Sequence, residues 1–361
     1  MRWLRRAQSC VLLLVALTLG AACAPSPAAP ASPLPGGITP NEAAPRPSEA
    51  AEGRPRVAVR SAYTSESASE LTLQVAHEAD TFAKYGLDVT VERIAGGSPK
   101  VVAAMLAGDV DIAQIGGPVV ADARVAGADL VYTTANIPVL ALSLYAIPAV
   151  TRMEDLRGNA IAITRAGTVT DFGARTALTH YGLRPEVDVG IVQTGGLVEG
   201  LATVQAGNAV ATLLGPPYDI IARQQGLHEL LDLPSLGVEF LLNGLAVQRE
   251  YLTRNEDVLM RFMRGYLEAI ARIKEDKAFA KQVLGKYTDT TDDAALESGY
   301  EAFGQRYLAR VPYPTAAQLQ TVIDFVAERD PSARDLQPES LFDDRFVRAL
   351  DQEGFIDRLY R

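Results

Sequence analysis

Cysteine is nearly absent from this chain of 361 residues, which contains only Cys10 and Cys23. If an N-terminal segment ending at residue 22 is removed, Cys23 becomes the first residue and residues 24–361 carry no thiol. A body without cysteine has no disulfide, no iron–sulfur cluster, no CxxC zinc site and no cysteine nucleophile. Its length and its 48% hydrophobic residues are sufficient for about two domains stabilised by their cores alone.

Histidine and basic residues are also scarce. His77, His180 and His228 show no paired spacing, and no P-loop, dinucleotide fingerprint or HExxH motif occurs. The sequence therefore predicts no metal, no cofactor and no catalytic residue, and the chain is not expected to be an enzyme. Lys and Arg number 34 against 44 Asp and Glu, and loss of the three arginines before residue 22 would leave 31 against 44, a net charge of −13. This acidic balance argues against nucleic acid as a partner.

The N-terminus has the features of an export signal. Three arginines precede an apolar run over residues 11–19, which is too short to span a bilayer. Small residues from Gly20 onward end directly before Cys23 and resemble a bacterial lipobox, although lipoboxes favour Leu at the position of Gly20. We expect a signal peptide over 1–22, lipidation (palmitate) at Cys23, and a Pro/Ala-rich extended tether over 23–55. Ordinary signal cleavage and an uncleaved anchor are the alternatives at Cys23.

Strands and helices alternate through the body. The segments 57–59, 88–94 and 110–115 are predicted strands, and each is followed by polar or glycine-rich residues that open a helix. A capping box over 67–70 predicts a helix to about Lys84, and Ser98 is the expected N-cap of the next helix. Such alternation predicts mostly parallel sheets with ligands at the carboxyl ends of the strands.

This arrangement recurs about a hundred residues later. Gly96-Gly97, Ala107-Gly108 and Gly116-Gly117 return as Gly195-Gly196, Ala206-Gly207 and Gly215-Pro216, each 99 positions on. We interpret the repeat as two lobes of like topology, the alternative being that these are common pairs. The predicted division is 56–148 with 246–361 for lobe one and its C-terminal helices, and 149–245 for lobe two.

With these motifs, and with the segment from Ala162 to Asp171, the chain resembles the periplasmic binding proteins of nitrate, sulfonate, bicarbonate and thiamine-precursor ABC importers. The resemblance spans about 57–327. It implies a two-lobed α/β fold of the type II periplasmic binding protein class, with a mostly parallel sheet flanked by helices in each lobe and a ligand cleft between them.

The resemblance also implies a set of ligand-binding residues in the loops that face the cleft. In lobe one these are Tyr63, Thr64, Gly97, Ser98, Gly117 and Asn136; in lobe two they are Thr168, Val169, Thr170, Asp171, Gly196, Pro217 and Tyr218, with Asn243 on the returning strand. Each has a simpler explanation: the glycines as turns, the threonines as helix caps, the tyrosines as packing residues and the asparagines as turn residues.

The ligand class stays open at this stage. No Arg or Lys is among the candidate positions, which disfavours a doubly charged oxyanion. Glu66, Asp171 and Glu199 can accept hydrogen bonds from a nitrogenous group, or can be solvated surface acids. Sulfonate, a nitrate-like anion and a pyrimidine- or flavin-type heterocycle therefore all remain candidates.

The expected function is that of the extracytoplasmic, lipid-anchored solute-binding component of an ABC importer. It would capture a small molecule by hinge closure and deliver it, as a monomer, to permease and ATPase subunits. The rivals are a ligand-binding sensor of the same fold and an enzyme related to pyrimidine synthases. The missing cysteines argue against the enzyme, whereas nothing in the sequence decides against the sensor.

Overall fold

The computed structural model describes residues 56–361, so the predicted signal peptide, Cys23 and tether lie outside the described residues. The strands of the described part are β1 (Val57–Tyr63), β2 (Leu87–Arg93), β3 (Ile112–Gly116), β4 (Leu130–Tyr132), β5 (Ile137–Val139), β6 (Ser143–Ala146), β7 (Ala160–Ile163), β8 (Gly190–Gln193), β9 (Ala211–Leu214), β10 (His228–Asp232) and β11 (Glu239–Gln248). They form two separate sheets.

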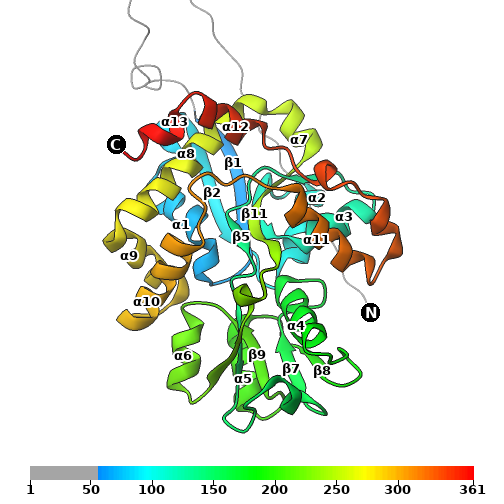
Figure 1. Ribbon diagram of the computed structural model, residues 1–361. Helices are drawn as coiled ribbons and strands as arrows, with labels where there is room; N and C mark the ends of the chain where they lie inside the picture. Colours follow the sequence, from blue (N-terminus) through cyan, green and yellow to red (C-terminus); the bar gives the residue numbers. More distant parts are fainter. Residues whose placement is uncertain (1–55) are drawn as a thin grey trace, which may run out of the picture. The chain divides into compact units, whose positions relative to one another are not determined.

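Helices follow most strands and continue to the C-terminus (Figure 1). They are α1 (Leu71–Glu78), α2 (Ser98–Ala107), α3 (Pro118–Val125), α4 (Val169–His180), α5 (Leu197–Gln205), α6 (Tyr218–Gln224), α7 (Arg249–Arg254), α8 (Glu256–Glu275), α9 (Lys277–Thr288), α10 (Asp293–Tyr300), α11 (Ala316–Ala327), α12 (Arg345–Gln352) and α13 (Phe355–Arg358). A π-helical turn, Glu301–Arg306, follows α10. In the part of the chain described, no helix is both long and apolar enough to cross a membrane.

The two sheets share one topology. The first has the order β2-β1-β3-β11-β4, with β5 paired to β11, and the second has the order β8-β7-β9-β6-β10. In the first sheet β1 is parallel to both of its neighbours, and in the second sheet β7 is parallel to both of its neighbours. The strand that enters each sheet from the other lobe, β11 or β6, is antiparallel to its neighbours. The predicted α/β fold of two similar, mostly parallel sheets is therefore confirmed, and the 99-residue repeat corresponds to β2-α2-β3-α3 and β8-α5-β9-α6.

We define lobe one as the first sheet with α1–α3 and α7–α13, and lobe two as the second sheet with α4–α6. The chain passes between the sheets twice, after β5 and before β11. The first crossing precedes Ser143, whereas the sequence analysis placed it near Pro148. The second precedes Glu239, whereas the sequence analysis drew the boundary at 246. The positions differ because a strand that follows a crossing looks the same in sequence whichever sheet it joins.

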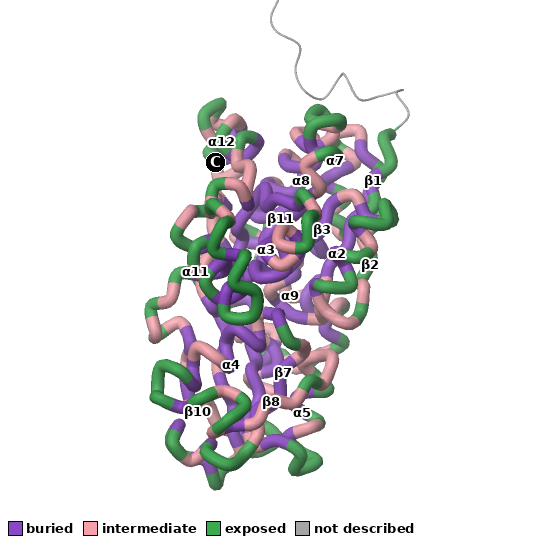
Figure 2. Tube along the Cα trace, turned by 90° about the vertical axis from the view of Figure 1, so that its right-hand side faces the viewer, coloured by how far each residue is buried: buried purple, intermediate pink, exposed green. Residues whose placement is uncertain are grey.

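Buried residues form the interior of both lobes (Figure 2). Between the lobes, Phe172 of α4 stacks on Phe240 of β11, with ring centroids 4.3 Å apart and planes within 5°. The same ring meets Phe325 of α11 edge-on at 5.0 Å. This aromatic group therefore joins lobe two to lobe one beside the second crossing.

Local signals were partly correct. Ser67 caps the predicted helix start by accepting from the Ser69 backbone N–H, but the α-helix ends at Glu78 instead of Lys84. The N-cap of α2 is Gly97, and Ser98 occupies its first turn. Gly97 has φ of +82°, a conformation that favours glycine, so the turn before Ser98 requires a residue without a side chain at position 97.

Candidate functional site

A cavity of about 280 Å³ lies between the two sheets, at the carboxyl ends of their parallel strands. Loops after β1, β2, β3, β7, β8 and β9 contribute to its wall, together with the start of β11. This is where the sequence analysis expected a ligand, since ligands of open α/β sheets bind outside the strand carboxyl ends. We call this cavity the cleft.

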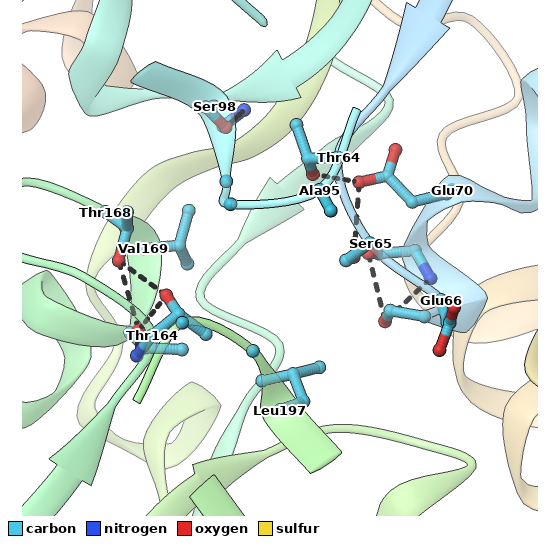
Figure 3. A pocket seen from close by; sticks show the side chains of 18 of the residues that line it. Thr64, Ser65, Glu66, Glu70, Ala95, Ser98, Thr164, Thr168, Val169 and Leu197 are labelled. Atoms are coloured by element: carbon cyan, nitrogen blue, oxygen red, sulfur yellow. Dashed lines mark hydrogen bonds between the residues drawn. The ribbon is translucent and has the colours of Figure 1, made fainter. Parts of the chain in front are cut away.

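Nine predicted residues line the cleft. From lobe one they are Thr64, Gly97, Ser98 and Asn243, and from lobe two they are Thr168, Val169, Thr170, Gly196 and Tyr218. Figure 3 shows Ser98, Ala95 and Thr64 on one side and Thr164, Thr168 and Val169 facing them. A solute in the cleft would thus contact both lobes.

Helix N-termini point to the cleft from both lobes. The first residues of α2, α4 and α5 are part of its lining, and none of these three helices has a side-chain cap hydrogen bond. The N–H groups of a helix's first turn have no partner within the helix and carry a partial positive charge. The cleft therefore offers backbone donors as well as side chains.

Three threonines organise the lobe-two wall. The Thr170 hydroxyl accepts a hydrogen bond from the Thr164 backbone N–H at 2.9 Å, and the hydroxyls of Thr164 and Thr168 lie 2.9 Å apart. Thr168 also donates to the Arg165 carbonyl at 2.7 Å. These hydroxyls hold the loop between β7 and α4 in shape, in addition to lining the cleft.

The main acid of the lobe-one wall is Glu70, which is 3% exposed. It accepts from the Thr64 hydroxyl at 2.7 Å and from the Gln114 side-chain amide at 3.0 Å. Burial raises the pKa of the Glu70 carboxyl to about 7, and the hydrogen bonds from Thr64 and Gln114 only partly oppose this. Gln114 in turn accepts from the Tyr266 hydroxyl at 2.6 Å, so Glu70 is tied into the core of lobe one.

Asn243 lines the cleft and carries a buried hydrogen-bond acceptor. Its side-chain Nδ2 donates to the Ser69 carbonyl at 2.6 Å, and its Oδ1 has no hydrogen-bond partner although the residue is 2% exposed. A carbonyl can only accept, so this contact fixes which end of the Asn243 amide is the donor. A buried oxygen without a partner is unfavourable, and a ligand donor would satisfy it.

Charged groups at the rim are mainly acidic. Arg93 is the cation in the lining, and it forms an ion pair with Glu66 at 3.0 Å. Glu199, at the start of α5, also lines the cleft. Tyr218 of lobe two donates to the Glu66 carbonyl at 2.8 Å, a direct contact between the lobes.

Five candidate residues lie outside the cleft lining, and one of them, Pro217, is the N-cap residue of α6. Tyr63 is buried and meets the ring of Tyr287 edge-on at 6.1 Å, and Asn136 bonds to Thr134 and Tyr266 in the core. Asp171 is fully buried and accepts from the Gly167 N–H and from Arg175. Gly117 allows a close backbone approach, since a Cβ there would lie 2.3 Å from the Leu241 carbonyl oxygen. Of the glycines in this turn, Gly116 lines the cleft instead.

Sequence reasoning missed several lining residues. Ser67, Ser69 and Glu70 were assigned only to a capping box, although their position directly after a strand could have marked them as site residues. The apolar Leu142, Leu197 and Leu242 carry no signal that distinguishes them from core residues. Within residues 56–361 no group of three or more His, Cys, Asp or Glu is placed to hold a metal ion.

Comparison with solved structures shows the fold. The chain is similar to the alkanesulfonate-binding protein SsuA from Xanthomonas axonopodis pv. citri bound to MOPS, at 19% identity and a TM-score of 0.67 over 81% of this chain and 99% of that one. It is also similar to the periplasmic nitrate-binding protein NrtA from Synechocystis PCC 6803, at 13% identity and 0.69 over 85% and 91%. A Candida albicans protein described as having the generic periplasmic binding protein fold matches at 14% identity and 0.62 over 80% and 96%.

These matches confirm the predicted two-lobed periplasmic binding protein architecture, and the SsuA and NrtA neighbours are described as binding proteins. No curated protein sequence matches the chain. The model of the NMT1-like family matches residues 64–285, which include every strand from β2 to β11 and all the residues that line the cleft. Because this match spans more than half of the sequence, the chain belongs to the NMT1-like family.

Proposed function

We propose that this protein is the extracytoplasmic solute-binding component of an ABC importer. The observation that carries the proposal is the cleft, to which both lobes contribute polar side chains and helix N-termini. The sulfonate- and nitrate-binding neighbours support the same role. The ligand is a small polar solute, and delivery to a permease with its ATPase is the output.

Hinge closure would couple binding to delivery. Two chain crossings join the sheets, and the lobes also meet through the aromatic contact of Phe172 with Phe325 and through polar contacts such as the hydrogen bond from Ser298 to Asp219 at 2.7 Å. A solute that bonds to both lobes favours the closed form over the open one, and the permease would then recognise the closed form.

Export and anchoring complete the proposal. The signal-like segment and Cys23 favour a protein attached outside the membrane by a lipid, with residues 23–55 as the tether, and we propose that it acts as a monomer. The mass of the N-terminal peptide from the purified native protein tests this, since an acylated Cys23 adds the mass of the lipid.

A thermal-shift screen tests the receptor function. The solutes would include nitrate, bicarbonate, alkyl- and arylsulfonates, thiamine precursors, flavins, amines and amino acids. A solute present at about 100 times its Kd should stabilise the protein by about 2.7 kcal/mol, which raises Tm by roughly 4 °C for a folded body of about 300 residues.

The matched control is Ala95→Trp, which places a large side chain in the cleft lining. A true cleft ligand should shift the melting temperature of the native protein and leave that of the variant unchanged. If no solute gives a shift that depends on an open cleft, the receptor proposal fails.

A further inference from the structure

The polar groups of the cleft specify the ligand more narrowly than the fold does. The first of these groups is the Asn243 Oδ1, a buried acceptor without a partner. Because Nδ2 of the same amide is held by the Ser69 carbonyl, the side chain cannot turn over to present a donor without breaking a 2.6 Å hydrogen bond. Only a ligand that carries an N–H or O–H group satisfies this oxygen.

The charges around this acceptor have the sign that attracts a cation. The cleft lining contains Glu66, Glu70 and Glu199 against Arg93 alone, and Arg93 already pairs with Glu66. Lys100 and Arg165 lie near the turn at Gly96 and Gly97, but neither is part of the lining. A nitrate or sulfonate group would enter this site without a free lining cation to pair with.

One helix N-terminus that could attract an anion is already covered by an acid. The Glu199 carboxylate folds back over the start of α5, and its Oε2 lies only 2.0 Å from the position that a Cβ on Gly196 would take. A carboxylate there interacts favourably with the helix dipole and repels a second anion. The sequence allows this arrangement because residue 196 has no side chain.

We infer that the solute carries a nitrogen hydrogen-bond donor, such as a protonated amine, an amidinium or a ring amino group, which binds Asn243 in the acidic part of the cleft. This inference rests on the proposed receptor function and sets this chain apart from its nitrate- and sulfonate-binding structural neighbours. Lobe two then contributes hydroxyls and N–H groups to the acceptor atoms of the same solute.

Shape-matched pairs of solutes test the inference by calorimetric titration of the purified protein. The pairs are benzamidine with benzoate, 2-aminopyridine with 2-methylpyridine, and butylamine with butanoate. We expect the donor-bearing member of at least one pair to bind at least about tenfold more tightly than its partner, as a charge-assisted hydrogen bond predicts.

Two variants test whether the acidic lining of the cleft causes the preference for a cationic solute. Glu199→Gln removes one negative charge from the lining and should weaken binding of a cationic member by about tenfold, as expected for one unit charge at the edge of a solvated site. Glu328→Gln makes the same change at an exposed residue outside the lining and should leave the affinity unchanged.

The outcomes separate the inference from the proposed function. Tight binding of nitrate, sulfonates or the carboxylate members, with no donor preference, would overturn the inference and leave the receptor function intact. If no member of the three pairs binds and an anion of the thermal screen does, the inference is likewise overturned and the receptor function is kept. If no solute binds, either in the calorimetric titrations or in the thermal screen, the inference and the receptor function are both overturned.

Discussion

Replacing Asn243 by leucine is expected to weaken solute binding by about 100-fold, because a buried ligand donor would lose its only acceptor at this position. The ligand-free protein should change by less than about 1 kcal/mol in unfolding free energy, since an apolar residue of similar shape also removes an unpaired oxygen. The Ser69 carbonyl keeps a donor, the Gln114 amide, at 3.0 Å. Titration calorimetry and denaturant unfolding measure the two quantities.

Asn136→Leu is the matched control. Asn136 is fully buried in the same lobe, but it does not line the cleft and instead bonds to Thr134 and Tyr266. This variant should lose about 2–3 kcal/mol of stability, because its partners are left unsatisfied, with little change in affinity of the folded protein. The opposite pattern, in which Asn243→Leu loses stability and keeps its affinity, would make Asn243 a structural residue.

Glu70→Gln is expected to stabilise the ligand-free protein in a pH-dependent way. The pKa of Glu70 is raised from 4.5 in the unfolded chain to about 7 in the folded one by burial. Between these values the folded protein keeps a proton that the unfolded chain has released. The contribution of the Glu70 carboxyl to the unfolding free energy is therefore fully present below about pH 4.5 and is lost as the pH rises through about 7.

Glutamine imitates the protonated acid, so the variant does not undergo this loss. Its amide oxygen can accept from Gln114 and its amide nitrogen can donate to Thr64, which preserves both contacts. The difference in unfolding free energy between variant and native protein should be near zero at pH 4.5 and about 3 kcal/mol at pH 8. Urea unfolding across this range measures it, and a difference that does not vary with pH would contradict the account.

The fold was predictable because the same order of strands, glycine turns and helices occurs twice in the sequence. The pairs Gly96-Gly97 and Gly195-Gly196 mark equivalent strand-to-helix turns, and the structure places them at the starts of α2 and α5. The predicted positions of the two crossings differ from those in the structure because β6 and β11, the strands that directly follow the crossings, are apolar. No local pattern tells which partner strands they find.

The candidate site was predicted at the level of loops better than at the level of side chains. Most of the loops that were singled out reach the cleft, because strand carboxyl ends are recognisable, but the segment with Asn136 does not. Which side chain turns inward depends on pleat and packing: Thr64 lines the cleft while its neighbour Tyr63 packs on Tyr287. The lining residue Asn243 could be placed by sequence, but its unpaired oxygen appears only in three dimensions.

The central claim, that a solute closes the two lobes around the cleft, is tested most directly by a distance between them. Spin labels at Leu106→Cys in lobe one and Val187→Cys in lobe two use exposed positions, 48% and 68% exposed, in a body that has no other cysteine after residue 23. Pulsed electron paramagnetic resonance should show a shift to a shorter and narrower distance when a solute from the screen is added. A distribution unchanged by a solute that binds would contradict closure of the lobes as the mechanism.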